Sequence, residues 1–271
     1  MWRYIEDNNV SASFGLAADE YLVTAFNPPH PNPLPQGERE GRGSGILRLY
    51  TYKSHCALVG RFQDVEKELN LEECKRRGIA VNRRPTGGGA ILMGEDQLGI
   101  AIVSPLLEES RGTACRAPTI LFETYSKGVA LGLRRLGIEA EFRPKNDMLV
   151  NGKKIAGLAL FVEDNNNMLF HASVLLDMDI SLMLSVLNIS QGKLSGKGIN
   201  TAGGRITTVA KELGRKVFMR ELRDAIKLGF QDAFAVEFNH EPFNVNEITA
   251  IKKLEERKYK ASDWVYNSLD T

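Results

Sequence analysis

A chain of 271 residues, of which 43% are hydrophobic and 25% charged, has the composition of a soluble globular protein with a substantial buried core. Its formal net charge of +1 leaves no excess of basic residues for neutralising phosphates, which excludes a general nucleic-acid binder. No apolar run approaches the roughly 18 residues that a membrane-spanning helix needs, and the N-terminus lacks the apolar core of a signal peptide. The scattered cysteines Cys56, Cys74 and Cys115 fit neither a disulfide framework nor a metal site, which favours a cytoplasmic location.

The chain begins with an amphipathic helical pattern around residues 16–25, for which Ser11 or Ser13 can serve as the N-terminal cap. Residues 27–45 then carry five of the ten prolines and almost no apolar side chains. Such a segment cannot form a helix or strand with a buried face, so we expect a disordered surface loop within a single domain of residues 1–271. The alternative interpretation is a proline-rich ligand for a partner protein.

Strand-like and helical patterns are interleaved along the rest of the chain. The predicted strands cover residues 46–52, 57–59, 97–104, 158–162 and 168–176, and the predicted helices cover residues 64–77, 118–136, 179–187, 220–234 and 246–258. Asn151-Gly152, between two β-prone runs, is the strongest short-range signal for a hairpin. Because several strand pairs are hairpins, the sheet should be mixed or antiparallel with helices against it, which is an α+β fold.

The most distinctive stretch is Arg83-Arg84-Pro85-Thr86-Gly87-Gly88-Gly89-Ala90, which lies between two apolar, strand-like runs. Three glycines have no side chains to keep an anion away from their N–H groups. Two arginines add fixed positive charge and bidentate donors, so the stretch predicts a cradle for a phosphate or carboxylate. The spacing is neither that of a P-loop nor G-x-G-x-x-G. The alternative is a glycine-rich hairpin with two solvated arginines.

Three further features stand near the predicted hairpin. Lys145-Asn146-Asp147 precedes it, Lys154 follows its turn, and His171 lies in the next strand. Taken singly, Asn146-Asp147 is typical of a turn, Lys154 of a solvated hairpin, and His171 of a satisfied core histidine.

Together and in this order, the motifs resemble the lipoate-protein ligases of the biotin and lipoate ligase superfamily. The family pattern runs Arg-Arg-x-Ser/Thr-Gly-Gly-Gly-Ala, Asn-Asp-Leu/Ile, Lys-Val/Ile-x-Gly, His-Gly/Ala and Lys-Gly-Ile. The matching segments are residues 83–90, 146–148, 154–157, 171–176 and 197–199, with Arg205-Ile206-Thr207 after the last and further matches at residues 16–20 and 60–63. The resemblance covers nearly the whole chain outside the proline-rich segment.

The resemblance implies an α+β catalytic domain of biotin/lipoate ligase type, with a mixed, largely antiparallel sheet flanked by helices. It implies that lipoate or octanoate reacts with ATP and Mg²⁺ to give an acyl-adenylate such as lipoyl-AMP. The acyl group would then pass to a lysine of a lipoyl carrier protein, such as the glycine cleavage H protein or a 2-oxoacid dehydrogenase E2 lipoyl domain. No nucleic-acid or membrane partner is expected.

The resemblance also assigns roles to residues. Lys154 is the expected catalytic residue, because an amine between the acyl carbonyl and the phosphate can stabilise the oxyanion of each step. The expected substrate-binding residues are Arg84, Gly87, Gly88, Gly89, Gln63 and His171, and the expected nucleotide contacts are Asn146, Asp147, Ala90 and Lys154. Asp147 is also the expected ligand of Mg²⁺. Arg83 could instead brace the glycine loop.

Two departures from the family pattern leave other functions open. Where the family often has a histidine after the glycines, this chain continues Ile91-Leu92-Met93-Gly94-Glu95-Asp96. This difference leaves the details of the substrate open, but it does not remove any of the predicted charged site residues. The chain also ends soon after residues 258–264, where the catalytic domain would finish. A separate accessory subunit could therefore complete a ligase, because a reactive adenylate must be shielded from water.

The main alternative is an ATP-independent transferase that moves octanoyl or lipoyl groups between carrier proteins. Transferases of the superfamily use a nucleophilic cysteine and commonly have arginine in place of Gly89. No cysteine lies near Asn146-Asp147, and Cys115 is interpreted as incidental, so an acyl-cysteine mechanism has little support. Lys154 speaks against a non-catalytic homologue. A biotin ligase would carry a Gly-Arg-Gly-Arg-type signature, which this sequence lacks.

Overall fold

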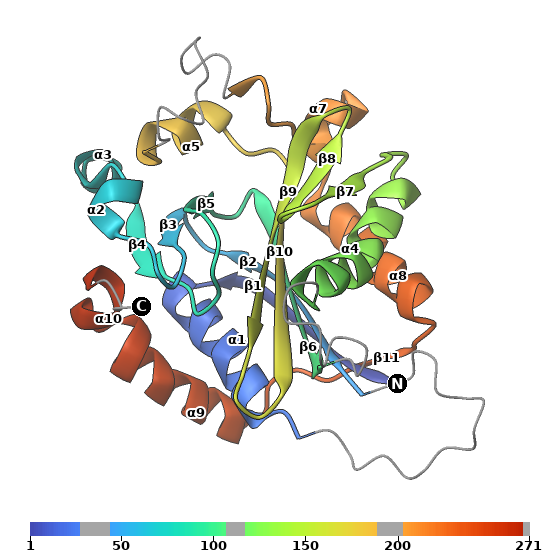
Figure 1. Cartoon of the computed structure of the whole chain (residues 1–271), viewed down its shortest axis with the longest axis horizontal. Helices are drawn as coiled ribbons and strands as arrows, with labels where there is room; N and C mark the ends of the chain where they lie inside the picture. The colour runs from blue at the N-terminus through green and yellow to red at the C-terminus, as the bar shows by residue number, and fades with distance from the viewer. Residues whose placement is uncertain (28–43, 107–116, 189–202, 268–271) are drawn as a thin grey trace.

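A mixed β-sheet runs through the centre of the computed structural model, which describes residues 1–27, 44–106, 117–188 and 203–267 (Figure 1). Within these residues the sheet has eight strands in the order β11-β1-β2-β6-β10-β9-β8-β7. β1 pairs in parallel with β2 and β11, and the other neighbours pair antiparallel. The predicted α+β fold with a largely antiparallel sheet is confirmed. The strands are β1 (Trp2–Val10), β2 (Ile46–Tyr52), β6 (Gln97–Pro105), β7 (Glu141–Arg143), β8 (Asp147–Val150), β9 (Lys153–Val162), β10 (Asn167–Leu175) and β11 (Phe238–His240).

A second, smaller sheet carries the glycine motif. Its described strands, in the order β4-β3-β5, are β4 (Ala80–Arg83), β3 (Cys56–Val59) and β5 (Ile91–Met93). β4 pairs in parallel with β3, whereas β5 pairs with it antiparallel. The two apolar runs that flank the glycines therefore share β3 as a neighbour and do not pair with each other. The glycine stretch is a crossover loop and not the turn of a hairpin.

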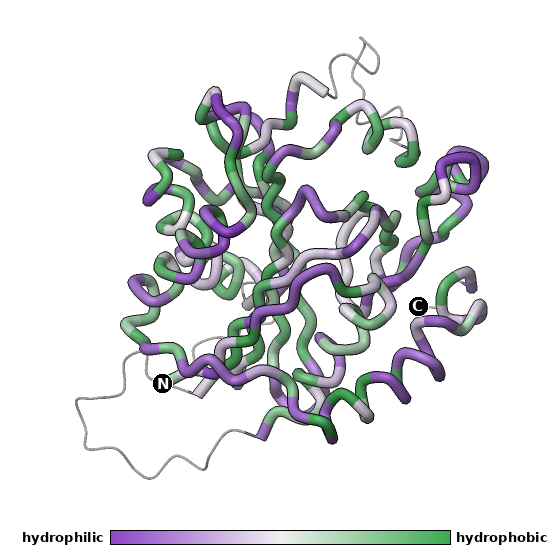
Figure 2. Tube along the Cα trace, turned by 180° about the vertical axis from the view of Figure 1, so that it is seen from behind, coloured by the Kyte–Doolittle hydropathy of each residue, from purple (hydrophilic) through white to green (hydrophobic). Residues whose placement is uncertain are grey.

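Helices cover both faces of the main sheet (Figure 1). α4 and α8 pack against each other on one face, and α1 and α9 pack together on the other. Each face buries its own apolar core, and Figure 2 shows the hydrophobic segments gathered toward the sheet. The helices are α1 (Ala12–Ala25), α2 (Val65–Glu68), α3 (Leu71–Arg77), α4 (Ala117–Arg135), α5 (Ile180–Val186), α7 (Val209–Leu213), α8 (Met219–Phe234), α9 (Val245–Leu254), the π-helical turn η3 (Glu255–Tyr259) and α10 (Ser262–Tyr266).

Local sequence signals account for several element boundaries. The Ser11 hydroxyl accepts a hydrogen bond from the Phe14 amide at 3.2 Å and caps α1, and Asp179 caps α5 in the same way. Asn151 and Gly152 have positive φ angles of 49° and 75°, which a two-residue hairpin turn between β8 and β9 requires. The predicted cap of the first helix, the cap at Asp179 and the hairpin are confirmed.

Other elements differ from the prediction. The expected helix over residues 64–77 is interrupted between α2 and α3, because Leu69 is extended, buried and bridged to Leu187. β1 is hidden from sequence-based prediction by the polar run Glu6-Asp7-Asn8-Asn9, which breaks its apolar alternation. Of the predicted loop at residues 27–45, residues 28–43 lie outside the described ranges.

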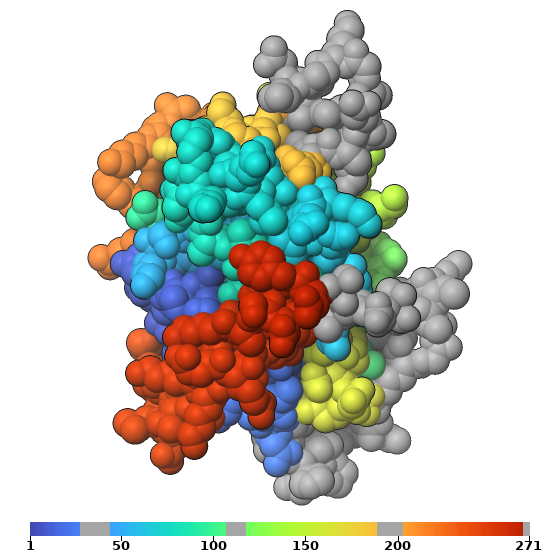
Figure 3. All heavy atoms as spheres, turned by 90° about the vertical axis from the view of Figure 1, so that its left-hand side faces the viewer, coloured from blue at the N-terminus to red at the C-terminus, as the bar shows by residue number. Residues whose placement is uncertain are grey.

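The C-terminal segment from α9 to α10 lies over α1 and β4. Figure 3 shows it next to α1 on one face of the molecule. It therefore reaches the strand that leads into the glycine motif. None of the helices in the described ranges combines the length and the apolar character needed to cross a membrane.

Candidate functional site

A cavity of about 1100 Å³ lies between the two sheets and is bounded by α1, α5 and the glycine loop. The polar side chains of its lining include those of Arg84, Arg143, Lys145, Asn146, Asp147, Lys154 and His171, and the backbone of Gly89 and Ala90 lies beside them. The apolar part of the lining includes Leu16, Leu58, Met93, Leu175, Met183 and Leu187. An apolar compartment beside convergent polar groups suits a ligand with an apolar tail and a polar head.

The floor of the cavity is a row of small residues that crosses the main sheet. The strand register places Tyr50 opposite Gly99, Gly99 opposite Ser173, Ser173 opposite Gly157, and Gly157 opposite Asp147. Side chains of directly paired residues project from the same face of a sheet. The Tyr50 ring lies across Gly99. Ser173 and Gly157 therefore separate the ring from the Asp147 carboxylate, which leaves a groove with one aromatic and one charged end.

Lys154 lies at the charged end of this groove. Its Nζ is 2.6 Å from Oδ1 of Asp147, and both side chains are 36% exposed. Its backbone N–H donates to the carbonyl of Arg205 at 2.7 Å, and its carbonyl accepts from the N–H of Thr207 at 2.9 Å. A Cβ on Gly157 would come within 3.3 Å of Nζ, so the amine lies over that glycine. A cation held in this way is preorganised to stabilise negative charge beside it.

Arg84 lies behind the glycine loop. Its guanidinium donates to the carbonyl oxygens of Gly87 at 2.9 Å and Gly89 at 2.7 Å. Burial lowers the pKa of Arg84 to about 10, so the group keeps its charge at neutral pH. None of the described carboxylates forms an ion pair with it. Its positive charge is therefore uncompensated close to the cavity wall that it lines.

The glycine loop itself is held in place from several sides. Arg83 is fully buried and donates to the carbonyl oxygens of Gly60, Arg61, Gln63, Trp264 and Val265. A Cβ on Gly60 would lie 2.2 Å from the Gly88 carbonyl oxygen, so only glycine permits this approach. Among the described residues, no protein hydrogen bond uses the N–H groups of residues 87–89. These N–H groups are available to an anionic or carbonyl oxygen.

A buried ionic network supports the loop from the sheet. Asp19, on α1, binds Nη1 of Arg48 at 2.6 Å and accepts from Nε2 of His171 at 2.9 Å. The strand register places Arg48 and His171 on either side of Ala101, whose small side chain leaves room for the carboxylate. Nδ1 of His171 faces the Thr86 hydroxyl at 3.4 Å. Burial alone would raise the pKa of Asp19, but the charges of Arg48 and His171 hold it below its usual range.

Most of the residues predicted for the site meet around the one cavity. Gln63, Gly87 and Gly88 do not line it. The Gln63 side chain instead accepts a hydrogen bond from the Gly60 N–H at 2.8 Å and closes its own turn. Gly88 lies against the Asn146 side-chain amide, which donates to the carbonyl of Leu158 at 3.0 Å. The predicted site residues that line the cavity are Arg84, Gly89, Ala90, Asn146, Asp147, Lys154 and His171, and their roles stay predictions.

The cysteines of the described ranges do not reach the cavity. Cys56 and Cys74 are buried free thiols, and burial raises the pKa of both, which disfavours the nucleophilic thiolate. Cys115 falls outside the described residues, as does the predicted segment Lys197-Gly198-Ile199.

No metal-binding cluster is present in the described ranges. These residues contain no group of three or more His, Cys, Asp and Glu side chains that could hold an ion. The carboxylate of Asp147, which was expected to contact Mg²⁺, is engaged by Lys154.

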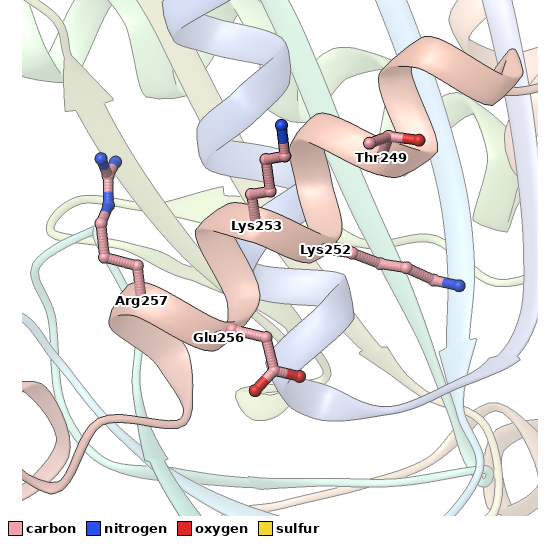
Figure 4. Close-up of a pocket in the computed structure, with 5 residues that line it drawn as sticks. All are labelled: Thr249, Lys252, Lys253, Glu256 and Arg257. Carbon is pink, nitrogen blue, oxygen red and sulfur yellow. The ribbon is translucent and has the colours of Figure 1, made fainter.

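A second, shallower hollow lies on the outer surface of α9 and η3. Figure 4 shows that its side chains leave the helix in different directions and do not converge on one point. The hollow is lined by Thr249, Lys252, Lys253, Glu256 and Arg257. It is a solvated helix face and offers no comparable enclosed site.

Arg48 and Asp19 were not assigned a role from sequence. A usable signal exists, because Arg48 interrupts the apolar strand Ile46–Tyr52, and all seven residues of that strand are buried. A cation at such a position requires a buried carboxylate partner. The identity of that partner depends on how α1 packs over β2 and β10, which the sequence does not reveal.

The comparison with known families decides the affiliation of the chain. A family model described as the lipoyl protein ligase A/B catalytic domain matches residues 11–231. The chain belongs to this family. Its relatives include the octanoyltransferase LipM of Brevibacillus brevis, which is 27% identical, with 97% of this chain and 98% of that protein covered.

Solved structures of the family share the fold. A bipartite lipoate protein ligase of Thermoplasma acidophilum, described together with its E2 lipoyl domain, superimposes with a TM-score of 0.80 at 24% identity. That match covers 100% of this chain and 99% of the other. A lipoate-protein ligase A bound with ATP gives a TM-score of 0.79 at 24% identity and covers 98% and 99% of the two chains.

The comparisons correct the predicted activity of this family member. Relatives that align over almost their full length carry a name for transfer of an octanoyl group, so the expected ATP-dependent lipoate ligase is wrong. The physical reason for the error lies in chemistry that both activities share. Attack on an acyl-adenylate and attack on a thioester both create an oxyanion at the acyl carbon, and a nearby cation would stabilise either one.

Proposed function

We propose that this family member is an ATP-independent acyltransferase. It moves an octanoyl or lipoyl group from a thioester on one carrier protein to a lysine amine of a lipoyl-type carrier domain. The observation that carries acyl transfer as the reaction is the position of the Lys154 amine at the open, charged end of an apolar groove. The names of the full-length relatives support the same activity.

The reaction needs no external energy source, because a thioester is already an activated acyl group. The neutral acceptor amine attacks the thioester carbonyl, a C–N bond forms, and the carbonyl oxygen takes up negative charge. When the tetrahedral intermediate collapses, the C–S bond breaks, and the proton lost by nitrogen passes to the sulfur. The products are an amide and a free thiol.

The charged end of the groove meets the demands of this step. The Lys154 ammonium can lie beside the oxyanion, and Asp147 keeps it oriented. The free N–H group of Gly89, which lines the cavity, can donate to the same oxygen or to the donor's polar arm. Arg84 adds an uncompensated positive charge behind the loop. No cysteine is required for a direct transfer of this kind.

The apolar end holds the tail. The groove floor runs from Gly157 over Ser173 toward Tyr50, and the surrounding wall includes Leu16, Leu175 and Met183. An extended acyl chain placed over the glycine and serine would bury its methylenes against these side chains.

The experiment supplies purified protein with an octanoyl-thioester carrier and an unmodified lipoyl domain, without nucleotide, and follows the mass of the lipoyl domain. We expect acylation of one lysine. A parallel reaction replaces the thioester by free octanoate, with and without Mg²⁺-ATP. Acylation that occurs only with free acid and ATP would overturn the proposal.

A further inference from the structure

We infer that Gly99 sets the length of the acyl chain that the cavity accepts. It has no side chain, so two groups that line the buried end of the cavity can pack against its backbone. The inference rests on the proposed function. Gly99 belongs to none of the sequence motifs and does not itself line the cavity. It acts through the ring of Tyr50 and the terminal methyl of Met93.

The space above Gly99 is filled by these two groups. A Cβ at position 99 would lie 2.5 Å from both Cε2 and Cζ of Tyr50 and 2.6 Å from Cε of Met93. Such distances are far inside van der Waals contact, so the ring and the methyl occupy the volume of the missing side chain. Tyr50 and Met93 are both buried, and both line the cavity. The glycine therefore lets them lie back against the sheet.

The Tyr50 ring has neighbours on both sides along its own strand. Cζ of Arg48 lies 4.2 Å from the ring centroid, and the Tyr52 ring centroid is 5.6 Å away. All three side chains project from the same face of β2, since they are two residues apart. These neighbours block movement along the strand. A ring pushed off Gly99 must therefore move toward the cavity.

The position of Gly99 matches the distal end of a medium-length tail. From Gly157, beneath the Lys154 amine, to Gly99 the register crosses two strand spacings, which is roughly 10 Å. A tail whose carbonyl lies at Lys154 reaches Tyr50 and Met93 with its methyl end. Each methylene that loses its place there weakens binding about fourfold.

A tyrosine lying across a glycine can also be a packing device with no effect on specificity. The chain offers a matched control for that alternative. A Cβ on Gly128 would lie 2.2 Å from Cδ1 of Phe230 between α4 and α8, on the other face of the sheet. Gly128→Ala therefore creates a comparable clash between a methyl and a ring, at a place remote from the cavity.

The test measures kcat/KM for hexanoyl, octanoyl and decanoyl thioesters of one carrier with the wild-type protein, Gly99→Ala, Met93→Ala and Gly128→Ala. Gly99→Ala should lower the ratio of decanoyl to hexanoyl transfer by about tenfold or more, which corresponds to about two methylenes. Met93→Ala should raise that ratio because it opens the closed end. Gly128→Ala should leave the ratio within about twofold of wild type, whatever it does to stability.

Calorimetric binding of the corresponding free fatty acids gives a readout that does not need turnover. An unchanged chain-length ratio in both Gly99→Ala and Met93→Ala would overturn the inference, as would an equal shift in Gly128→Ala. If Gly99→Ala does not fold, the decanoyl-to-hexanoyl ratio of Met93→Ala alone tests the inference, and an unchanged ratio overturns it. A wild-type protein that binds these acids but transfers no acyl group would overturn the proposed function. The inference about Gly99 would then be tested by the calorimetric chain-length preferences of the wild type and the variants.

Discussion

Asp19 and His171 form a buried hydrogen bond of 2.9 Å, although they lie 152 positions apart in the chain. The same carboxylate binds Arg48 at 2.6 Å, so one side chain of α1 ties together two strands of the main sheet directly beneath the glycine loop. Both Asp19 and Arg48 are fully buried. The shape of the site floor therefore depends on buried charges. Water cannot reach them, so each is stabilised by its protein partners alone.

Asp19→Asn should destabilise the protein strongly. Within the described part of the chain, the change leaves the buried Arg48 guanidinium with Asp7, at 2.7 Å, as its one remaining carboxylate partner. Breaking one side of a buried ion pair typically costs about 3–5 kcal/mol. Urea unfolding measures the loss. Glu139→Gln, which removes the exposed partner of Arg134, is the control and should change stability little. A loss of less than about 1 kcal/mol for Asp19→Asn would contradict this account.

The low pKa of Asp19 also predicts how stability depends on pH. A carboxylate whose folded pKa lies below its ordinary value of 3.8 stabilises the fold above that value and loses this contribution as the pH falls toward the folded pKa. The difference in unfolding free energy between wild type and Asp19→Asn should therefore stay constant from neutral pH to about pH 5. Below about pH 4 it should shrink, by at most about 1.4 kcal/mol per pH unit. Urea titrations at each pH check this, and a difference that already shrinks between neutral pH and about pH 5 would contradict it.

Lys154→Met should reduce kcat by about 10²–10³-fold, because it removes the cation nearest to the developing oxyanion. Its thermal stability should stay close to wild type, since the pair with Asp147 is partly exposed. Lys153→Met is the matched control, because this adjacent lysine is exposed and does not line the cavity. Single-turnover acyl transfer with both variants measures the effect. Equal rates for the two variants would remove Lys154 from the mechanism.

Sequence signals were sufficient where structure depends on neighbouring residues. The turn at Asn151-Gly152 needs only two positive φ angles, and the cap at Asp179 needs only an adjacent helix N-terminus. The glycine stretch could be singled out from its own residue types, because a plain turn does not require two arginines beside the glycines. Lys154 was singled out only through the order of the motifs, and its role stays a prediction. A binding site around them could then be predicted, but the residues that line its cavity could not all be named from the sequence.

The features that escaped prediction depend on contacts between distant strands. The groove floor exists because Gly99 and Gly157 fall in one register row, and a one-residue shift would have turned them to the other face. Asp19 finds Arg48 and His171 only after α1 packs on the sheet. The choice between ligase and transferase also escaped, since a cation beside the acyl carbonyl would suit the oxyanion of either reaction.

Removing all three cysteines should preserve acyl transfer, because the proposed direct attack forms no acyl-cysteine. Cys56 and Cys74 are buried, and their raised pKa keeps them protonated at neutral pH. Transfer rates of the single alanine variants and of the triple variant provide the measurement, with circular dichroism as a check of folding. A specific loss of turnover in Cys115→Ala, with the fold intact, would instead indicate a covalent acyl-enzyme.

The C-terminal segment should be energetically coupled to the glycine motif, although it lies beyond the part of the chain that the family model matches. Arg83 donates to the carbonyl of Trp264 at 2.9 Å, and the indole Nε1–H of Trp264 donates back to the carbonyl of Arg83 at 2.9 Å. Trp264→Phe keeps the ring but loses the second bond, at a cost of about 1 kcal/mol. Arg83→Lys cannot reach the carbonyls on both sides at once and should cost more.

A double-mutant cycle separates coupling from two independent losses. If the reciprocal bonds act as a unit, the double variant Arg83→Lys/Trp264→Phe should be more stable than the sum of the single losses implies, by at least about 0.5 kcal/mol. Urea unfolding of the four proteins gives this value. Arg135→Lys, whose pair with Asp232 is exposed, combined with Trp264→Phe should be additive. Additivity in both cycles would mean that the C-terminal segment packs against β4 without bracing the loop that follows it.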